Sequence, residues 1–370
     1  MAAVVITIKY QITMKRTFMI TTLAAALMGG QVFAATVIPT EVTGKPYGKW
    51  VDSNAWFCGA YSGTDQEAKN GTVNVTAVES GGDSYAADHR VCGGGSRSGD
   101  ANNNAAIMYG GQVGYLIGGA VATNKTSSDN VVVMAGGTAQ YVYGGYSALN
   151  TNKATINTNN KVHLVGVGYT GTLTLPNDSH GNAQSVTVTG SALSITKIVG
   201  AGNNYTGSTN TNNTLDIYGT KIEVAQIVAT TTLSFHITDG LATAEAPMLN
   251  YTATTTSKVL TFHDDKKVGS GCEFIATEVT DWSAFAGKSI TLVQAQKAIQ
   301  GLTEDDLKEG GVELKGADGA VVATATLVLE NEGMRLVMSN IKAASPTPEP
   351  TTGVLSLLGL GLLAGRRRKH

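Results

Sequence analysis

The sequence contains few of the residues that build catalytic and metal centres. Only 3 cysteines and 6 histidines occur in 370 residues. No two cysteines form a Cys-x-x-Cys pair, so zinc-binding and thioredoxin-like chemistry have no support. Gly-x-Ser-x-Gly, His-Glu-x-x-His and P-loop motifs are absent from the body of the chain. The sequence therefore predicts no catalytic residue, no metal site and no cofactor.

Charged residues are also scarce, at 15% of the chain, and they are unevenly placed. Seven of the 26 basic residues lie in the two terminal segments, which hold no acidic residue. The body between them has 19 basic and 28 acidic residues, a net charge of −9. Because nucleic-acid binding needs a basic face, the acidic body excludes nucleic acid as a partner.

Long amphipathic helices are not expected, because Leu-rich and Glu/Lys-rich stretches are few. Glycine is abundant instead, with 45 residues or about 12% of the chain against a usual value of roughly 7%. Short Val/Ile/Thr runs separated by Gly and Asn are typical of strands and turns. Since 42% of the residues are hydrophobic, the chain can bury a core, and its composition predicts an all-β protein.

The N-terminal segment has the three parts of a secretory signal peptide. A basic start at Met14-Lys15-Arg16 precedes an apolar run over residues 18–28 and a small-residue cleavage site that ends at Ala34. A buried core helix is the other interpretation of the apolar run. We expect residues 1–34 to be a signal peptide that is cleaved after Ala34, with Met14 as the true start.

The C-terminal segment is organised like a membrane-targeting signal. A Pro-rich linker at residues 344–350 is followed by the mostly apolar, uncharged residues 351–365 and by a cluster of cations at 366–369. The 15 apolar-segment residues would span about 22 Å as a helix, slightly short for a ~30 Å hydrocarbon core. The cations would hold their end on the cytoplasmic side of the membrane.

This order of Pro-Glu-Pro, apolar segment and terminal Arg cluster resembles the PEP-CTERM sorting signal of Gram-negative envelope proteins. The resemblance covers about the last 25 residues. It implies that a membrane peptidase of the exosortase type recognises and removes the tail, after a transient stay in the inner membrane. The body would then reach the outer membrane, the cell surface or the extracellular matrix. The sorting residues implied are Pro348, Glu349, Pro350, Arg366, Arg367 and Arg368.

The body repeats itself between about residues 71 and 240. Residues 107–111 recur as residues 133–137, 26 positions later, and the Gly-Gly pairs that follow are also in register. Strands with alternating apolar and polar positions are expected to start in successive repeats. The expected starts lie near Val73, Ile107, Val131, Val162, Val186 and Leu215.

A repeat of this length predicts a solenoid, because one unit cannot bury its own apolar face. We therefore predict a parallel β-helix, with a β-sandwich carrying Gly-rich loops as the alternative. The repeats resemble those of autotransporter-type surface β-helix proteins. The domains expected are a signal peptide (1–34), an N-terminal cap (35–70), a repeat β-helix (71–240), a C-terminal β-rich cap region (241–343), a Pro-rich linker (344–350) and a sorting tail (351–370).

Both ends of such a solenoid need closure, since an open end exposes apolar surface and strand edges. Trp50, Trp56 and Phe57 are expected to close the N-terminal end. A short helix is expected at residues 303–307, where Thr303 is a suitable N-cap.

Several polar groups of the body are candidates for chemistry, each with a structural alternative. Asp83, Asp88, His89 and Arg90 lie near Cys92 in a Gly-rich loop, and glycan-cleaving β-helix enzymes use carboxylates or a base with Ca²⁺. A solvated loop is the other interpretation. Residues 263–267 read as a charged turn or a weak metal site. In an oxidising compartment, Cys58 and Cys92 could form a disulfide.

Two further groups are open to both structural and functional interpretations. His163 and His236 lie in strand-like runs, where a hydrogen-bonded structural histidine is expected. A set of tyrosines could present rings to a glycan or pack half-buried. These tyrosines are Tyr109, Tyr115, Tyr141, Tyr143 and Tyr146.

The sequence thus predicts an exported, non-catalytic surface, matrix or adhesion protein. A secreted glycan-binding or glycan-degrading β-helix protein is the alternative. The partners expected are an exosortase-type peptidase during processing and an extracellular polysaccharide or host glycan afterwards.

Overall fold

A computed structural model describes residues 45–47, 56–62, 67–75, 90–122, 124–147, 155–178, 180–202, 208–262 and 268–344. All of these belong to one structural unit, Pro39–His370. Several positions singled out in the sequence lie outside the described residues. These are Ala34, Trp50, Asp83, Asp88, His89, residues 263–267, the sorting tail and the side chains of Trp56 and Phe57.

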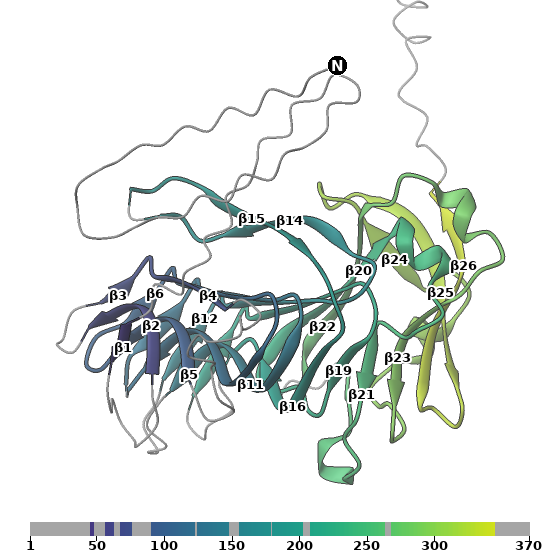
Figure 1. Cartoon of the computed structure of the whole chain (residues 1–370). Coiled ribbons are helices and arrows are strands. Elements are labelled where there is room, and N and C mark those ends of the chain that lie inside the picture. Colours follow the sequence, from purple (N-terminus) through teal and green to yellow (C-terminus); the bar gives the residue numbers. More distant parts are fainter. Residues whose placement is uncertain are drawn as a thin grey trace, which may run out of the picture. The chain divides into compact units, whose positions relative to one another are not determined.

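The strands of the body stack in three columns of parallel strands (Figure 1). The first column contains β4 (Thr72–Val75), β7 (Ala105–Met108), β10 (Val131–Met134), β13 (Lys161–Val165), β18 (Thr214–Tyr218), β20 (Thr230–Thr238), β22 (Val268–Glu278) and β24 (Val312–Lys315). The second contains β2 (Trp56–Ser62), β5 (Arg90–Ser96), β8 (Gln112–Val121), β11 (Gly137–Ser147), β16 (Leu193–Gly200), β19 (Ile222–Val224), β21 (Leu249–Tyr251) and β23 (Ile290–Ala295). The third is shorter and contains β3 (Ala68–Lys69), β6 (Ala101–Asn102), β9 (Thr126–Ser128), β12 (Ile156–Thr158) and β17 (Thr209–Thr211).

Along the chain from β2 to β18, strands of the second, third and first columns follow one another in that order, and each round is one coil of a parallel β-solenoid. From β19 to β24, strands of the second and first columns alternate. This confirms the predicted fold class. Alternate residues of the first column face a common core. Val132 pairs in register with Val162, and Val162 pairs with Leu215, and all three side chains are fully buried. Stacking therefore buries the apolar face that a single coil would expose.

Five of the six expected strand starts lie in the first column, but the expectation for Val186 is wrong. Val186 lies in β15 (Gln184–Thr189), which pairs antiparallel with β14 (Thr170–Leu175) in a hairpin inserted between coils. Leu173 and Val188 of this hairpin cluster with Val133, on the side of the first column that faces away from the main core. A hairpin strand with one buried face has the same two-residue alternation as a coil strand, so periodicity cannot distinguish them.

The stack of coils extends further than residues 71–240 in both directions. It begins with β2, and parallel pairing continues through β24. At the C-terminal end, β25 (Val321–Glu330) and β26 (Arg335–Ala343) pair antiparallel with each other and join β24 to β23. At the N-terminal end, β1 (Lys45–Tyr47) pairs antiparallel with β2. These antiparallel strands cover edges that the last coils would otherwise leave open.

Helices are short in the described part of the chain. The expected helix near Thr303 is present as α1 (Glu304–Leu307). The 3₁₀ helices are η1 (Asp239–Thr243), η2 (Thr256–Lys258) and η3 (Trp282–Phe285). No helix among the described residues is both long and apolar enough to cross a membrane.

Candidate functional site: the polar faces of the coils

The corner between the third and first columns is formed by the same two-residue pattern in successive coils. The first residue of each pair adopts the left-handed conformation, with φ between 54° and 57°. Asn and Asp tolerate this conformation better than other non-glycine residues because their side chains hydrogen-bond locally. The residues at this position are Asn70, Asn103, Asp129, Asn159 and Asn212.

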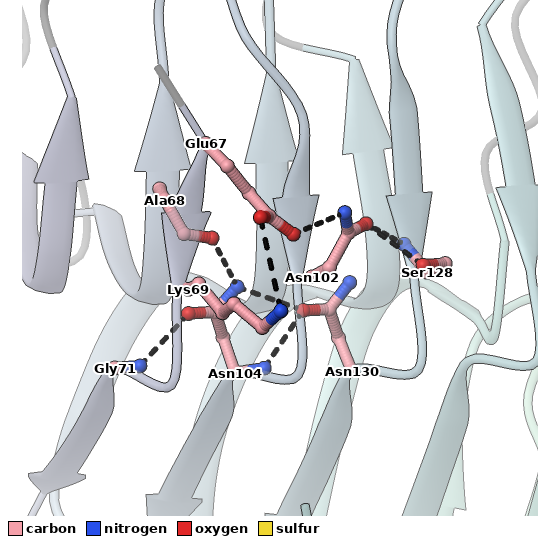
Figure 2. A network of polar contacts seen from close by, with 8 residues as sticks. All are labelled: Glu67, Ala68, Lys69, Gly71, Asn102, Asn104, Ser128 and Asn130. Atoms are coloured by element: carbon pink, nitrogen blue, oxygen red, sulfur yellow. Dashed lines mark hydrogen bonds and ion pairs between the residues drawn. The ribbon is translucent and has the colours of Figure 1, made fainter. Parts of the chain in front are cut away.

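The second residue of each pair forms a buried asparagine ladder, part of which is shown in Figure 2. Its members are Asn104, Asn130, Asn160 and Asn213, and none of their side chains is exposed. Nδ2 of Asn104 donates to Oδ1 of Asn130 at 3.0 Å, and Nδ2 of Asn130 donates to Oδ1 of Asn160 at 2.9 Å. In the first coil Gly71 takes the place of the asparagine, and its backbone N–H donates to Oδ1 of Asn104 at 2.9 Å.

Each ladder asparagine is also bonded to the backbone of the coil before it. Nδ2 of Asn130 donates to the Ala101 carbonyl at 2.9 Å, and Nδ2 of Asn160 donates to the Ser127 carbonyl at 2.8 Å. Buried amides are costly unless they are hydrogen-bonded, and here both ends of each amide have partners. The asparagine ladder therefore joins neighbouring coils and defines the corner.

The ladder also explains why glycines recur at one position of the second-column strands. Gly94, Gly119 and Gly145 pair in register in the second column. A methyl group at Gly119 would collide with the Asn130 amide, and one at Gly94 would collide with the Asn104 amide. Glycine is therefore needed at these positions so that the second column can approach the ladder.

The outer face of the third column carries polar side chains that bond to one another (Figure 2). Nδ2 of Asn102 donates to Oε1 of Glu67 at 2.6 Å, and the Ser128 hydroxyl donates to Oδ1 of Asn102 at 2.8 Å. Lys69 pairs with Glu67 at 3.9 Å. At β3, β6 and β9 these groups satisfy one another and leave little unused hydrogen-bonding capacity for a ligand.

A buried cluster of titratable groups lies on the outer face of the first column. Asp216 of β18 accepts from both flanking histidines, with 3.0 Å between Oδ2 and Nδ1 of His163 and 3.1 Å between Oδ1 and Nε2 of His236. The Tyr218 ring stacks on the His236 ring with 3.9 Å between centroids. The two histidines are thus hydrogen-bonded as the sequence interpretation expected.

The electrostatics of this cluster follow from its geometry. Burial alone would raise the pKa of the Asp216 carboxyl. The hydrogen bonds from His163 and His236 and their charges outweigh burial, and they hold the pKa of Asp216 well below its usual value of 3.8. The carboxylate is therefore ionised and engaged by two partners, which makes it a poor proton donor or nucleophile.

The tyrosines gather on the outer face of the second column, but their ring faces are covered. The rings of Tyr115 and Tyr141 stack on each other at 4.4 Å between centroids. Arg90 lies over the Tyr115 ring at 4.5 Å and Lys197 over the Tyr141 ring at 5.0 Å. Cations over aromatic rings are attracted by the ring quadrupole, so this stack is stable by itself. A sugar could not stack on these rings without displacing a cation.

Other residues singled out in the sequence lie nearby. Tyr143 and Tyr146 are buried beside the Tyr115–Tyr141 stack, and Tyr109 belongs to the edge of the cluster beneath the hairpin. Cys58 and Cys92 occupy facing positions of β2 and β5 and form a disulfide with 4.7 Å between Cα atoms. Within the described residues, no group of three or more His, Cys, Asp or Glu side chains is arranged to hold a metal ion.

Sequence reasoning missed the asparagine ladder. The signal was present as an Asn-Asn or Asp-Asn pair directly before the strand in four repeats, at 103–104, 129–130, 159–160 and 212–213. These pairs stood in tracts read only as polar linkers. Their spacing varies with the insertions between coils, which hides the pattern.

A family model for the PEP-CTERM protein-sorting motif matches residues 346–369. This match covers the Pro-Glu-Pro sequence, the apolar segment and the basic cluster. No curated protein and no solved structure matches the chain. The motif is associated with exosortase processing and with membrane-anchored sorting of exported proteins. The chain therefore carries a PEP-CTERM sorting motif, which implies that the protein is exported and directed to the surface through its C-terminal tail.

Proposed function

We propose that the protein is a non-catalytic component of the cell surface or extracellular matrix with a role in adhesion. The observation that carries the proposal is a ladder-stabilised solenoid preceding a sorting tail. Such a scaffold repeats its surface every ~4.8 Å and holds each outer face rigidly. That arrangement suits contact with an extended or repeating partner outside the cell.

The described clusters support a non-catalytic function. A glycan-cleaving site needs a carboxylic acid or carboxylate that can reach the substrate. Asp216 is 4% exposed and bonded to two histidines. Arg90, the described member of the Asp83–Arg90 group, lies over the Tyr115 ring.

The proposal also specifies the fate of the tail. An exosortase-type peptidase removes it close to Pro348-Glu349-Pro350, and the released body remains at the outer membrane, cell surface or matrix. We expect Glu349→Gln to leave an unprocessed precursor in the inner membrane, with Thr347→Ala as the matched control in the same linker. Mass spectrometry of the C-terminus of the protein from the native envelope measures this. An intact terminus at His370 in the wild-type surface fraction would show that the tail is a permanent anchor.

The non-catalytic part is tested separately. Protein recovered from the native envelope is incubated with a panel of glycans, and we expect no release of reducing ends or unsaturated sugars. Release that is abolished by Asp88→Asn or His89→Ala would establish an enzyme instead.

A further inference from the structure

A line of polar side chains crosses the outer face of the second column. These residues occupy the same register position in six consecutive strands, from β8 to β23. We name the line the polar stripe; its members are Gln112, Thr138, Ser194, Glu223, Asn250 and Gln294. At ~4.8 Å per strand, the six positions extend over about 24 Å.

The strand alternation places the polar stripe outside the core. Next to Ser194 in β16, Leu193 and Ile195 are buried, and next to Glu223 in β19, Ile222 and Val224 are buried. Side chains of successive strand residues point to opposite faces, so the stripe residues point away from the core.

A groove of about 430 Å³ lies over the middle of the polar stripe. Four stripe residues from β11, β16, β19 and β21 line it, and Lys221 and Ala192 lie beside them. The four are Thr138, Ser194, Glu223 and Asn250. The groove therefore crosses four coils in the direction in which the strands stack.

The groove residues differ from the third-column face in one respect. The side chains of Thr138, Ser194, Glu223 and Asn250 make no hydrogen bond or ion pair with any residue in the described part of the chain. Their hydroxyl, carboxylate and amide groups are therefore available to a ligand, spaced one coil apart.

The chemistry of the groove selects the class of ligand. Lys221 and Glu223 balance each other in charge, and the remaining polar groups are neutral donors and acceptors. An anionic polymer would need a basic surface, and the body has a net charge of −9. A peptide strand would need an unpaired strand edge, but β16, β19 and β21 are paired on both sides. Of these polymer classes, a hydroxyl-rich, uncharged chain is the ligand that fits the groove.

We propose that this groove binds a linear, uncharged polysaccharide laid along the polar stripe, with successive sugar units over successive coils. The inference rests on the proposed surface function and names its partner. Because the contacts are polar and contain no ring for stacking, single units bind weakly. Affinity therefore rises with chain length until the four groove coils are occupied.

The test uses the protein recovered from the native envelope and titrates it with cello-oligosaccharides, from dimer to hexamer, and with manno-oligosaccharides of the same lengths. Alginate and an extended Thr/Val-rich peptide serve as the anionic and peptide comparators. We expect one of the two neutral series to bind at about millimolar concentration or below and to bind more tightly with length. Ser194→Ala with Asn250→Ala should weaken that binding by about tenfold.

Two further variants make the result specific. Ala192→Trp should fill the groove and weaken binding without removing a polar group of the stripe. Thr211→Ala, an exposed third-column change, should leave the affinity within about twofold. A folding defect in the double variant, seen as a lowered Tm, leaves Ala192→Trp as the deciding measurement.

Three outcomes would overturn the inference. The first is that neither neutral series binds. The second is that Thr211→Ala weakens binding as much as Ser194→Ala with Asn250→Ala does. The third is that alginate or the peptide binds in preference to the neutral series. Surface location is measured independently by fractionation and accessibility of the intact protein to antibody. Surface display without glycan binding would therefore remove the inference and leave the proposed function standing.

Discussion

The outer faces of the second and third columns are both polar, but their side chains have different partners. On the third column, Asn102 bonds to Glu67 and to Ser128 across neighbouring coils. On the second column, Ser194 and Glu223 are neighbours in register and do not bond to each other. Polar residues at repeated positions therefore have two uses in this solenoid. They either join the coils or remain available at the surface.

The difference follows from side-chain chemistry. An asparagine above an asparagine can donate with one end of its amide and accept with the other, so identical residues form a continuous ladder. The polar stripe combines side chains of different lengths, such as Ser194, Glu223 and Asn250. A short hydroxyl and a long carboxylate at adjacent positions do not extend into a ladder. Identical asparagines therefore continue from coil to coil, whereas unlike side chains bond only where their lengths match, as those of Glu67, Asn102 and Ser128 do on the third column.

The largest loss of stability is expected from removing an asparagine at the centre of the ladder. Asn130→Ala removes the acceptor of Asn104 and the donor to Asn160, leaving buried polar groups unpaired. At ~1–3 kcal/mol for each unsatisfied group, we expect the free energy of unfolding to fall by about 4 kcal/mol. Urea unfolding measures it. Asn102→Ala, on the exposed network, is the matched control and should cost about 1 kcal/mol or less. Equal losses would contradict the distinction between buried ladder and exposed network.

A smaller loss of stability is expected when an added side-chain atom crowds the same ladder. Gly119→Ala places a methyl group against the Asn130 amide. Overpacking of this kind costs about 1–3 kcal/mol, and thermal unfolding should show a lowered Tm. Gly181→Ala is the control outside the ladder: it lies near the hairpin tip, where a methyl group meets nothing within 4 Å. Gly181 has positive φ, so a small cost of about 1 kcal/mol is expected there. If the two variants lose the same stability, the ladder does not require glycine at residue 119.

The Asp216 cluster extends the comparison to a covered face of the first column. The pKa of Asp216 is depressed in the fold, so its ionised form stabilises the protein. That contribution is complete above the usual carboxyl pKa of 3.8 and is lost as the pH falls below it towards the folded-state pKa. Asp216→Asn should cost about 2 kcal/mol at neutral pH and flatten the pH dependence of stability below pH 4.

Unfolding curves recorded between neutral pH and about pH 2 measure this effect. His163 and His236 bond to Asp216, and Tyr218 contacts both histidines. Asp305→Asn, at an exposed carboxyl paired with Lys308, is the control and should leave the pH profile unchanged. A wild-type-like acid profile for Asp216→Asn would show that the cluster does not carry the acid sensitivity.

The smallest effect on stability is expected from the polar stripe. Ser194→Ala and Asn250→Ala remove groups without a partner among the described residues, so each should change the free energy of unfolding by less than about 0.5 kcal/mol. Urea unfolding of these variants and of Asn130→Ala, under the same conditions, compares their losses in the free energy of unfolding. A loss of several kcal/mol from Ser194→Ala would mean that the stripe joins the coils, as the ladder does.

Much of the fold could be predicted from local sequence. The strand starts at Val73, Val162 and Leu215 were found because apolar alternation is a property of each strand by itself. Val186 shows the limit, since its alternation is equally good and its partner, Leu173, lies in the same hairpin. Only the pairing partner decides whether a strand belongs to a coil or to an insertion.

The sites were harder to predict than the strands. The tyrosines were recognised as a group, but the cations that cover Tyr115 and Tyr141 come from Arg90 and Lys197 in other coils. The polar stripe could not be seen at all, because 56 residues separate Thr138 from Ser194, with the hairpin between them. Insertions of irregular length make it impossible to read from the sequence which residues of neighbouring coils pair, even where the coils themselves are regular.

The sequence by itself determined the all-β composition, the repeated strand pattern and the sorting motif at residues 346–369. Each of these depends on residues close together in the chain, so local order is sufficient. The tertiary structure alone decided which Asn residues form the ladder, which polar groups remain unpaired and where the groove lies. These properties depend on which residues of different coils meet, and that is set by the register of stacking.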